Sequence, residues 1–309
     1  MTDTFHIIDN NLSNQTFYYN GSNTWQIWQK PPNCNYVNIF LLGGGAGGQG
    51  GEIGTGGAGG VTRDGGVGGG SSSITYVTYP AFALPDTLYV QVGAGGAGGA
   101  AAIGTGLQGS PGGLSYISVI PDSGYTTQNV VMVSGNAPAG TTTCNTAGTG
   151  IIVSQILLSE IAFISTYNGQ AGAARGLSSG TAGSITPTGI PITGGAGGSG
   201  VSSVGTLGTS GDINEFLFSP KISGGASNQT LGGSPGRAGY STRSSFYNAN
   251  YKLPLFFTGG SGGGAGDTSP GANGGNGAFG CGGGGGGAGQ TSAGTGGRGG
   301  DGLVIITVS

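Results

Sequence analysis

Glycine recurs at every third position through several long stretches of this chain, and this spacing limits the possible folds more than any other feature. In the stretch 271–289, GANGGNGAFGCGGGGGGAG, the phase is unbroken and comprises Gly271, Gly274, Gly277, Gly280, Gly283, Gly286 and Gly289. The same spacing occurs earlier at Gly45, Gly48, Gly51, Gly54, Gly57 and Gly60, with shorter copies at 93–99, 106–112 and 294–300. A period of three fits neither an α-helix, with its period of about 3.6, nor a strand. It fits the polyproline-II conformation.

A polyproline-II helix has no internal hydrogen bonds, so its N–H and C=O groups must find partners in neighbouring segments. Fixing one backbone residue costs about 1–2 kcal/mol, whereas a net hydrogen bond returns about 0.5–1.5 kcal/mol. One isolated glycine run would therefore be disordered. The chain has 13 prolines against 77 glycines, too few prolines for collagen. We therefore expect several polyglycine-II helices packed side by side within one chain and held by a separate core.

Short apolar segments beside the glycine runs supply the expected core. Residues 3–42 predict antiparallel strands at FHII, TFYYN, TWQIW and NYVNIFLL, separated by turn residues. Further strands are predicted at 87–92, 130–133, 190–193 and 253–258, each leading into glycine, and LVIITV closes the chain. The sequence thus predicts an all-β fold, in which a bundle of polyglycine-II helices extends from a β-sandwich-like layer of strands.

We predict one elongated domain over residues 1–309. Its parts are N-terminal strands in 1–42, alternating strands and glycine runs in 43–300, and a closing strand in 301–309. Two inserts interrupt the alternation, at 141–168 and 212–255. For residues 151–164, which begin IIVSQILLSEIAF, we expect a short helix because Ile152, Ile156 and Phe163 can share one helical face. The β-branched content of this segment also fits a buried strand.

Charge and motifs argue against several classes of function. Only 6% of the residues are charged, the net charge is −3 and no basic patch occurs, so we expect no nucleic-acid partner. The longest apolar segment is too short to span a bilayer, and the first residues do not resemble a signal peptide. The single histidine, His6, lies in a predicted strand, and Cys34, Cys144 and Cys281 have no metal-binding spacing. We expect free thiols, no cofactor, no metal and no enzymatic activity.

The aromatic segment 240–251, YSTRSSFYNANY, is the candidate recognition site. Tyr, Arg, Asn and Ser are typical of adaptable binding surfaces. The candidate receptor-contacting residues are Tyr240, Arg243, Phe246, Tyr247 and Tyr251. The alternative interpretation is that these aromatic side chains pack under the glycine bundle or cover its ends.

Three junctions carry a resemblance to a known family: TWQIWQKPPNCNYVNIFLLGGGAGGQGG, LPDTLYVQVGAGGAGG and the closing GGRGGDGLVIITVS. They resemble the glycine-rich domains of bacteriophage tail proteins, over about residues 17–309. Tail-fibre tip adhesins of some large phages are similar in displaying receptor-binding loops on layered polyglycine-II helices. The resemblance implies a virion protein made in the host cytoplasm, with other virion proteins and a host-surface receptor as partners and with an oligomer or fibre as its assembly.

Two other functions stay open at this point. The long inserts leave room for a protein that decorates a capsid or baseplate instead of tipping a fibre. Some ice-binding proteins also resemble this chain in stacking polyglycine-II helices. An ice-binding face should be regular, however, and the non-glycine positions here hold residues as different as Gln49, Glu52 and Phe279.

Overall fold

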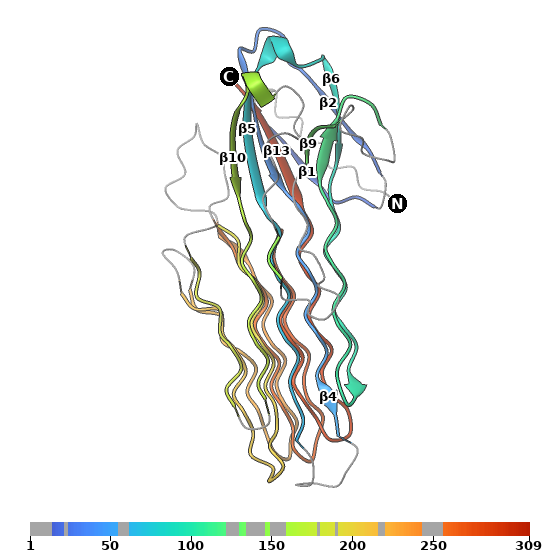
Figure 1. The fold of residues 1–309 in the computed structure, drawn as a ribbon, viewed down its shortest axis with the longest axis vertical. Coiled ribbons are helices and arrows are strands. Elements are labelled where there is room, and N and C mark those ends of the chain that lie inside the picture. Colours follow the sequence, from blue (N-terminus) through green and yellow to red (C-terminus); the bar gives the residue numbers. More distant parts are fainter. Residues whose placement is uncertain are drawn as a thin grey trace.

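A computed structural model of the chain describes residues 14–21, 24–54, 62–121, 130–133, 146–148, 159–177, 180–188, 191–215, 220–242 and 256–309. Its regular structure is mostly β-strand. The described residues contain no α-helix, only the short 3-10 helices η1 (Ala81–Ala83) and η3 (Ser159–Ile161). The predicted all-β class is therefore confirmed. Most of the strands gather at one end of an elongated molecule, extended glycine-rich runs fill the rest of its length, and the short strand β4 lies near the other end (Figure 1).

Two antiparallel sheets form the strand end of the molecule. The larger sheet has the order β1-β13-β3-β5-β10, and the smaller one has the order β2-β6-β8-β9. Their bounds are β1 Asn14–Tyr18, β2 Gln26–Gln29, β3 Tyr36–Leu42, β5 Ile74–Pro80, β6 Thr87–Gln91, β8 Tyr116–Ser118, β9 Val130–Val133, β10 Phe163–Tyr167 and β13 Leu303–Val308. Two further pairs of very short strands lie outside these sheets: β4 (Glu52–Ile53) with β7 (Ala102–Ile103), and β11 (Ser241–Thr242) with β12 (Phe256–Phe257).

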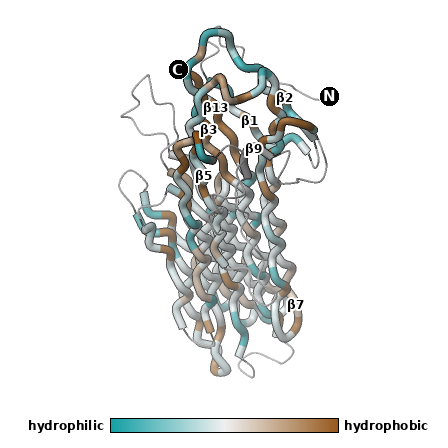
Figure 2. Tube along the Cα trace, turned by 45° about the horizontal axis from the view of Figure 1, so that its top comes forward, coloured by the Kyte–Doolittle hydropathy of each residue, from teal (hydrophilic) through white to brown (hydrophobic). Residues whose placement is uncertain are grey.

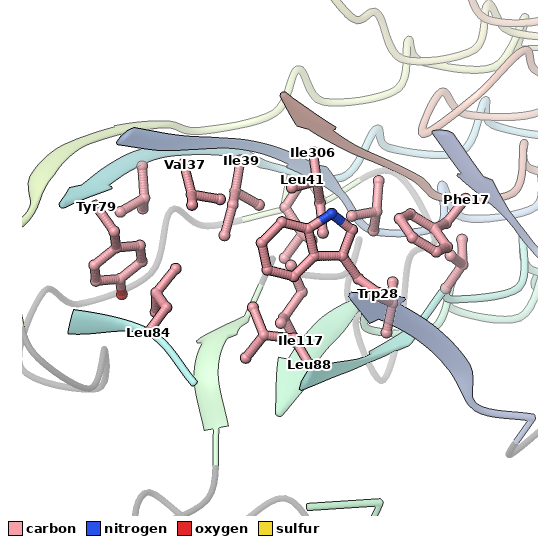
Figure 3. Close-up of a cluster of buried hydrophobic side chains, with 14 of the residues drawn as sticks. Phe17, Trp28, Val37, Ile39, Leu41, Tyr79, Leu84, Leu88, Ile117 and Ile306 are labelled. Atoms are coloured by element: carbon pink, nitrogen blue, oxygen red, sulfur yellow. The ribbon is translucent and has the colours of Figure 1, made fainter. Parts of the chain in front are cut away.

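A hydrophobic core lies between the two sheets, because each strand turns alternate side chains toward it. In β3, Val37, Ile39 and Leu41 point into this core and are fully buried. Trp28 of β2 and Leu88 of β6 pack against them from the opposite sheet (Figure 3). Burying one large apolar side chain contributes about 1.5–3 kcal/mol. The sandwich therefore has a source of stability that does not depend on the glycine runs.

The opposite face of the larger sheet is also apolar, and it rests on the ends of the glycine runs. Phe40 and Leu42 of β3 belong to a second buried cluster with Ile192, Phe257 and Cys281, which all lie at the starts of runs. Near this junction the strands are buried on both faces, which explains continuous apolar sequences such as IFLL and LVII. The glycine runs are thus fixed to the sandwich by side-chain packing.

We predict that Cys281 resists alkylation in the native protein. Its thiol is fully buried, and burial raises its pKa to about 12, although the backbone amide of Thr193 opposes the rise. Alkylating reagents attack the thiolate. At mildly alkaline pH, peptide mass spectrometry should find iodoacetamide on the half-buried Cys34 first, and on Cys281 only after unfolding in guanidinium chloride. Equal labelling of the two cysteines in the native protein would contradict this packing.

Several strand predictions are confirmed in the described residues, and one is not. TFYYN, TWQIW, NYVNIFLL, 87–92, 130–133 and LVIITV all contain strands, whereas FHII lies outside the described residues. Of the predicted strand 253–258, the structure describes 256–258, which contain β12. Of the predicted strand 190–193, it describes 191–193, which form only an isolated bridge between Ile192 and Phe257. Both segments enter the glycine-rich part, where the backbone hydrogen bonds of a run go to several neighbouring segments in turn. Strand β5 was not predicted, although ITYVTYP alternates in the way a strand does.

The short helix expected over 151–164 is not found in its described part. Residues 151–158 lie outside the described residues, and Ser159–Ile161 form η3. Phe163 and Ile164 belong to β10, which pairs with β5. For these two residues the strand alternative is therefore correct, as their aromatic and β-branched side chains favour, but the strand is not buried, because Phe163 is exposed.

The run 281–289 is the central one, and its backbone bonds to six other segments. Its amides donate to three segments in rotation, and its carbonyls accept from three more. Gly282, Gly283 and Gly284 donate to Thr193, Ala46 and Gly275, and Gly285, Gly286 and Gly287 donate to Ala196, Gln49 and Ala272 of the same three segments. The carbonyls of Gly283, Gly284 and Gly285 accept from Gly69, Gly297 and Gly263. Residues three apart in the central run therefore bond to the same neighbouring segment.

This arrangement explains why the central run is uninterrupted glycine from 282 to 287. A Cβ on Gly282, Gly283 or Gly284 would overlap the backbone carbonyl of a different neighbour in each case. All three directions around the run are occupied by backbone, so a side chain has no direction in which to point. A run with six neighbours therefore needs glycine at every position, and not only at every third one.

The run 43–54 has neighbours in fewer directions, and its sequence differs accordingly. Gly45, Gly48 and Gly51 face the central run, where a Cβ would overlap the carbonyls of Cys281, Gly284 and Gly287. A second phase, Gly44, Gly47 and Gly50, faces the run 93–101 in the same way. The remaining set of every third position carries side chains, those of Ala46, Gln49 and Glu52. Gln49 uses its amide to bond the Gly106 carbonyl and the Val67 amide, at 2.8 and 3.2 Å.

The stretch 271–289 is not the single run that its unbroken phase predicts. Residues 271–278 and 281–289 are antiparallel neighbours, because Gly284 donates to Gly275 and Gly287 donates to Ala272. The chain reverses at Gly280, whose φ of +68° is readily adopted only by glycine. The bulky Phe279 packs on Phe257 at the junction with the sandwich, with ring centroids 5.7 Å apart. Side-chain packing thus sets the reversal inside a glycine pattern that continues through it. Gly271, Gly274 and Gly277 face the central run.

Candidate functional site

The glycine runs alternately leave the sandwich and return to it, so their turns collect at the far end of the molecule, which we call the distal surface (Figure 1). Hydrogen bonds between neighbouring runs show that their ends lie at the same height along the long axis of the molecule. Gly266 donates to Ala288, the next residue Gly289 donates to Glu52 of β4, and β4 pairs with β7. Turns far apart in the sequence therefore lie in one cross-section. Glycine-rich runs appear pale in Figure 2, whereas the turns and the strands show both hydrophobic and hydrophilic positions.

Three distal turns share one local design, an aliphatic residue followed by a glycine with positive φ. The pairs are Ile103–Gly104, Val204–Gly205 and Leu231–Gly232, with glycine φ values of +86°, +78° and +90°. The aliphatic side chains are 68%, 80% and 86% exposed, respectively. Leu107 and Leu177, at the same end, are each 57% exposed. The left-handed glycine lets the chain reverse tightly and leaves the preceding side chain in solvent.

Two of these turns are neighbours. The Gln229 side-chain amide donates to the Gly205 carbonyl at 3.4 Å, which joins the turn of Leu231 to the turn of Val204. The turn that begins at Leu177 is close as well, since a Cβ on Gly208 would overlap the Gly180 carbonyl. The sequences of these turns, LSSG, SSVG and NQTLGG, contain no charged residue. Val204, Leu231 and Leu177 are thus exposed on neighbouring turns that carry no charge, and grouped exposed apolar side chains are typical of a binding site.

A buried ion pair lies beneath the distal turns. Arg63 is 1% exposed, and its guanidinium bonds the Asp267 carboxylate at 2.6 Å and the Asp267 carbonyl at 2.9 Å. The Gln290 side-chain oxygen accepts a further bond at 2.5 Å. This cluster joins the ends of three runs: 62–73, 258–266 and 281–289. It is structural, because the guanidinium of Arg63 and the carboxylate of Asp267 are largely buried and pair with each other.

A second charged group lies nearby at the run ends. Asp64 pairs with Arg175 at 3.2 Å, and the Asp64 amide donates to the Glu52 carboxylate at 3.0 Å. Burial raises the pKa of the Glu52 carboxyl, and the negative charge of Asp64 adds to the rise, while the Asp64 amide and the two arginines oppose it. The charged residues described at this end are thus paired among themselves.

Of the predicted receptor-contacting residues, the structure describes only Tyr240. Arg243, Phe246, Tyr247 and Tyr251 lie outside the described residues. Tyr240 is half-buried near the sandwich, far from the distal turns, and its hydroxyl donates to the Pro220 carbonyl at 2.6 Å. With Phe279, Arg298 and Asp301 it lines a shallow hollow of about 370 Å³. Tyr240 also contacts a small buried cluster around Ile213.

The exposed distal aliphatic residues were missed in the sequence. A signal for them exists: a single aliphatic residue followed by glycine, in a short stretch of Ser, Thr, Asn and Gly between two glycine runs. A search for the period of three does not detect these residues, because their turns interrupt that period.

Two findings on metal ions and membranes concern the part of the chain that the structure describes. Its His, Cys, Asp and Glu side chains form no group of three that could hold a metal ion. None of its helices is long and apolar enough to cross a membrane.

The fold and the distal surface define an all-β protein in which a strand sandwich holds hydrogen-bonded glycine runs with exposed turns. The chain matches the glycine-rich domain family over residues 20–309, and it belongs to that family. A comparison with curated proteins finds no match.

Proposed function

We propose that the protein is a virion structural component, a phage tail-fibre or adhesin subunit, and that its glycine runs are polyglycine-II helices. The rotation of the central run's hydrogen bonds through a period of three supports the helix type, since polyproline-II geometry has three residues per turn. The resemblance of the strand-to-glycine junctions to phage tail domains supports the viral role. The protein would be made in the host cytoplasm and assembled into the particle.

In this proposal the glycine bundle is a rigid, uncharged platform, and its turns contact the receptor. The observation that carries the proposal is the set of three distal turns that expose Ile103, Val204 and Leu231. Each is held by hydrogen-bonded runs on both sides, so the aliphatic side chains are presented in a fixed arrangement. A pre-organised surface loses less conformational entropy on binding than a flexible loop does. The aromatic segment 240–251 remains a second predicted contact region.

Capsid or baseplate decoration is the alternative, because the same distal surface can bind a neighbouring virion subunit. Ice binding is the less favoured candidate. The exposed distal residues are irregular in size and come from separate turns, whereas ice recognition needs one flat, regular face.

Immunogold labelling of purified particles with antibody against the recombinant protein tests the proposal. Gold at tail or fibre tips would support an adhesin, and gold over the capsid or baseplate would support decoration. Particles without gold, from a culture that expresses the protein, would contradict both viral roles, and an assay of ice recrystallisation would then test the remaining candidate.

We predict that replacing both Val204 and Leu231 by serine weakens binding of the recombinant protein to host cells at least about thirtyfold, since two contact side chains that each contribute roughly 1 kcal/mol or more together contribute about 2 kcal/mol or more. Fluorescence titration on whole cells provides the measurement. Phe82→Ser is the matched control, because Phe82 is 87% exposed at the opposite end of the molecule. Equal affinity of the double variant and the control would remove the distal surface from the receptor site.

A further inference from the structure

Among the described residues strand β10 forms one edge of the larger sheet, and its own sequence lacks the features that usually protect an edge. In the described structure it pairs with β5 and is the last strand in the sheet order. Its sequence, FISTY, contains no charged residue, no proline and no glycine. Natural edge strands are commonly protected by lysine, proline, bulges or very short length. An uncharged five-residue edge rich in aromatic and β-branched residues is therefore suited to pairing with another strand.

The side chains of β10 are exposed on one face of this edge. Phe163 is 76% exposed and Tyr167 is 52% exposed, and Ser165 between them is exposed as well. The three alternate with Ile164 and Thr166, so they point to the same side of the sheet. Two large aromatic side chains are thus placed in solvent at a sheet edge, at positions where a cross-strand neighbour would contact them.

We propose that a second copy of this chain pairs with β10 through its own β10, in antiparallel register about Ser165. In this register Phe163 lies opposite the partner's Tyr167, and Ile164 lies opposite the partner's Thr166. Both aromatic residues then gain aromatic cross-strand partners, which contribute about 0.2–1 kcal/mol per pair beyond alanine. The two larger sheets become one continuous sheet, and the two-fold interface is self-complementary, as in most homodimers.

Charge and shape agree with this occupant. The strand carries no charge that would repel its own copy across the two-fold axis. In Figure 1, β10 runs nearly along the long axis at the outer margin of the sandwich. Antiparallel pairing therefore points the glycine runs of the two copies in opposite directions. The dimer carries one distal surface at each end, so that one can bind a virion subunit while the other faces outward.

This dimer would be the oligomer that the resemblance to phage tail proteins implies. The observations that support the dimer, however, concern β10 alone. The proposed viral role and this dimer therefore fail independently, because particle labelling tests the first and the mass in solution tests the second.

Light scattering coupled to size exclusion tests the dimer on the full chain. We expect wild type at micromolar concentration to show a mass near double the 29.6 kDa of one chain. Ser165→Lys places two like charges directly across the two-fold axis and should weaken the dimer at least about tenfold, because directly opposed like charges destabilise a strand pair. Thr16→Lys, which adds the same charge to the exposed face of the other edge strand, β1, should leave the mass unchanged.

Ser165→Cys provides an independent test, because it detects the dimer by a cross-link instead of by a loss of dimer affinity. Directly opposed residues of antiparallel strands have Cα atoms about 4.5–5.5 Å apart, which is compatible with a disulfide. Mild oxidation should link two Ser165→Cys chains, whereas wild type and Thr166→Cys should stay unlinked. A monomeric wild type, an unaltered dimer in Ser165→Lys, or no cross-link in Ser165→Cys would overturn the proposal.

Discussion

Replacing Gly286 by alanine should lower the free energy of unfolding by at least about 3 kcal/mol. Gly286 lies in the central run, where its amide donates to Gln49 and its carbonyl accepts from Gly66. A single Cβ there would overlap the carbonyl of Gly294. The backbone cannot move aside, because six neighbours surround the run. Separating two runs leaves buried amides without partners, and each such group costs about 1–3 kcal/mol.

Urea denaturation monitored by tryptophan fluorescence and circular dichroism would measure this loss. Gly283→Val and Gly286→Val should be more severe, since a larger side chain separates the runs further. Gly180→Ala is the matched control: the nearest atom to its added Cβ would be the Leu177 carbonyl oxygen at 3.7 Å, an ordinary contact. The control should remain within about 1 kcal/mol of wild type. If Gly286→Ala and Gly180→Ala unfold alike, the close backbone packing of the central run is wrong.

Arg63→Met should destabilise the protein by about 3–5 kcal/mol, because it leaves the buried Asp267 carboxylate without its partner. The effect has a structural reason beyond the ion pair itself. Glycine runs with a period of three can slide past one another by three residues and recover the same hydrogen bonds. The sandwich fixes their register at one end. Arg63 and Asp267, which are far apart in sequence, fix it at the distal end.

Thermal and urea unfolding of Arg63→Met, Asp267→Asn and the double variant form a cycle that isolates the pair. The double variant should be less destabilised than the sum of the single variants, since no buried charge remains unpaired. Lys221→Met is the control, because Lys221 is half-exposed in its pair with Asp212 and should contribute at most about 1 kcal/mol. Equal losses in Arg63→Met and Lys221→Met would show that burial gives the Arg63 pair no special importance.

Much of the strand sandwich could be predicted, because its strands follow simple rules. Alternating apolar residues in β3 and the closing LVIITV identify strands by period, and the aromatic TWQIW provides the core residue Trp28. Predictions were wrong where a segment enters the glycine layer, as at Ile192, or where helix and strand patterns coincide, as at Phe163. The candidate site was harder to predict. The exposed valine and leucine of the distal turns are ordinary residues, and only the fold brings them together.

The sequence by itself determined that this chain needs close backbone packing. Glycine at every third position leaves room for neighbouring backbone, and the uninterrupted glycine at 282–287 marks the run with neighbours in every direction. Which segment occupies each direction was decided only by the tertiary structure. Glycines are identical and carry no side chain that could distinguish one neighbour from another. The reversal at Gly280, the pairing of Arg63 with Asp267 and the gathering of the distal turns all follow from where packed side chains hold the run ends.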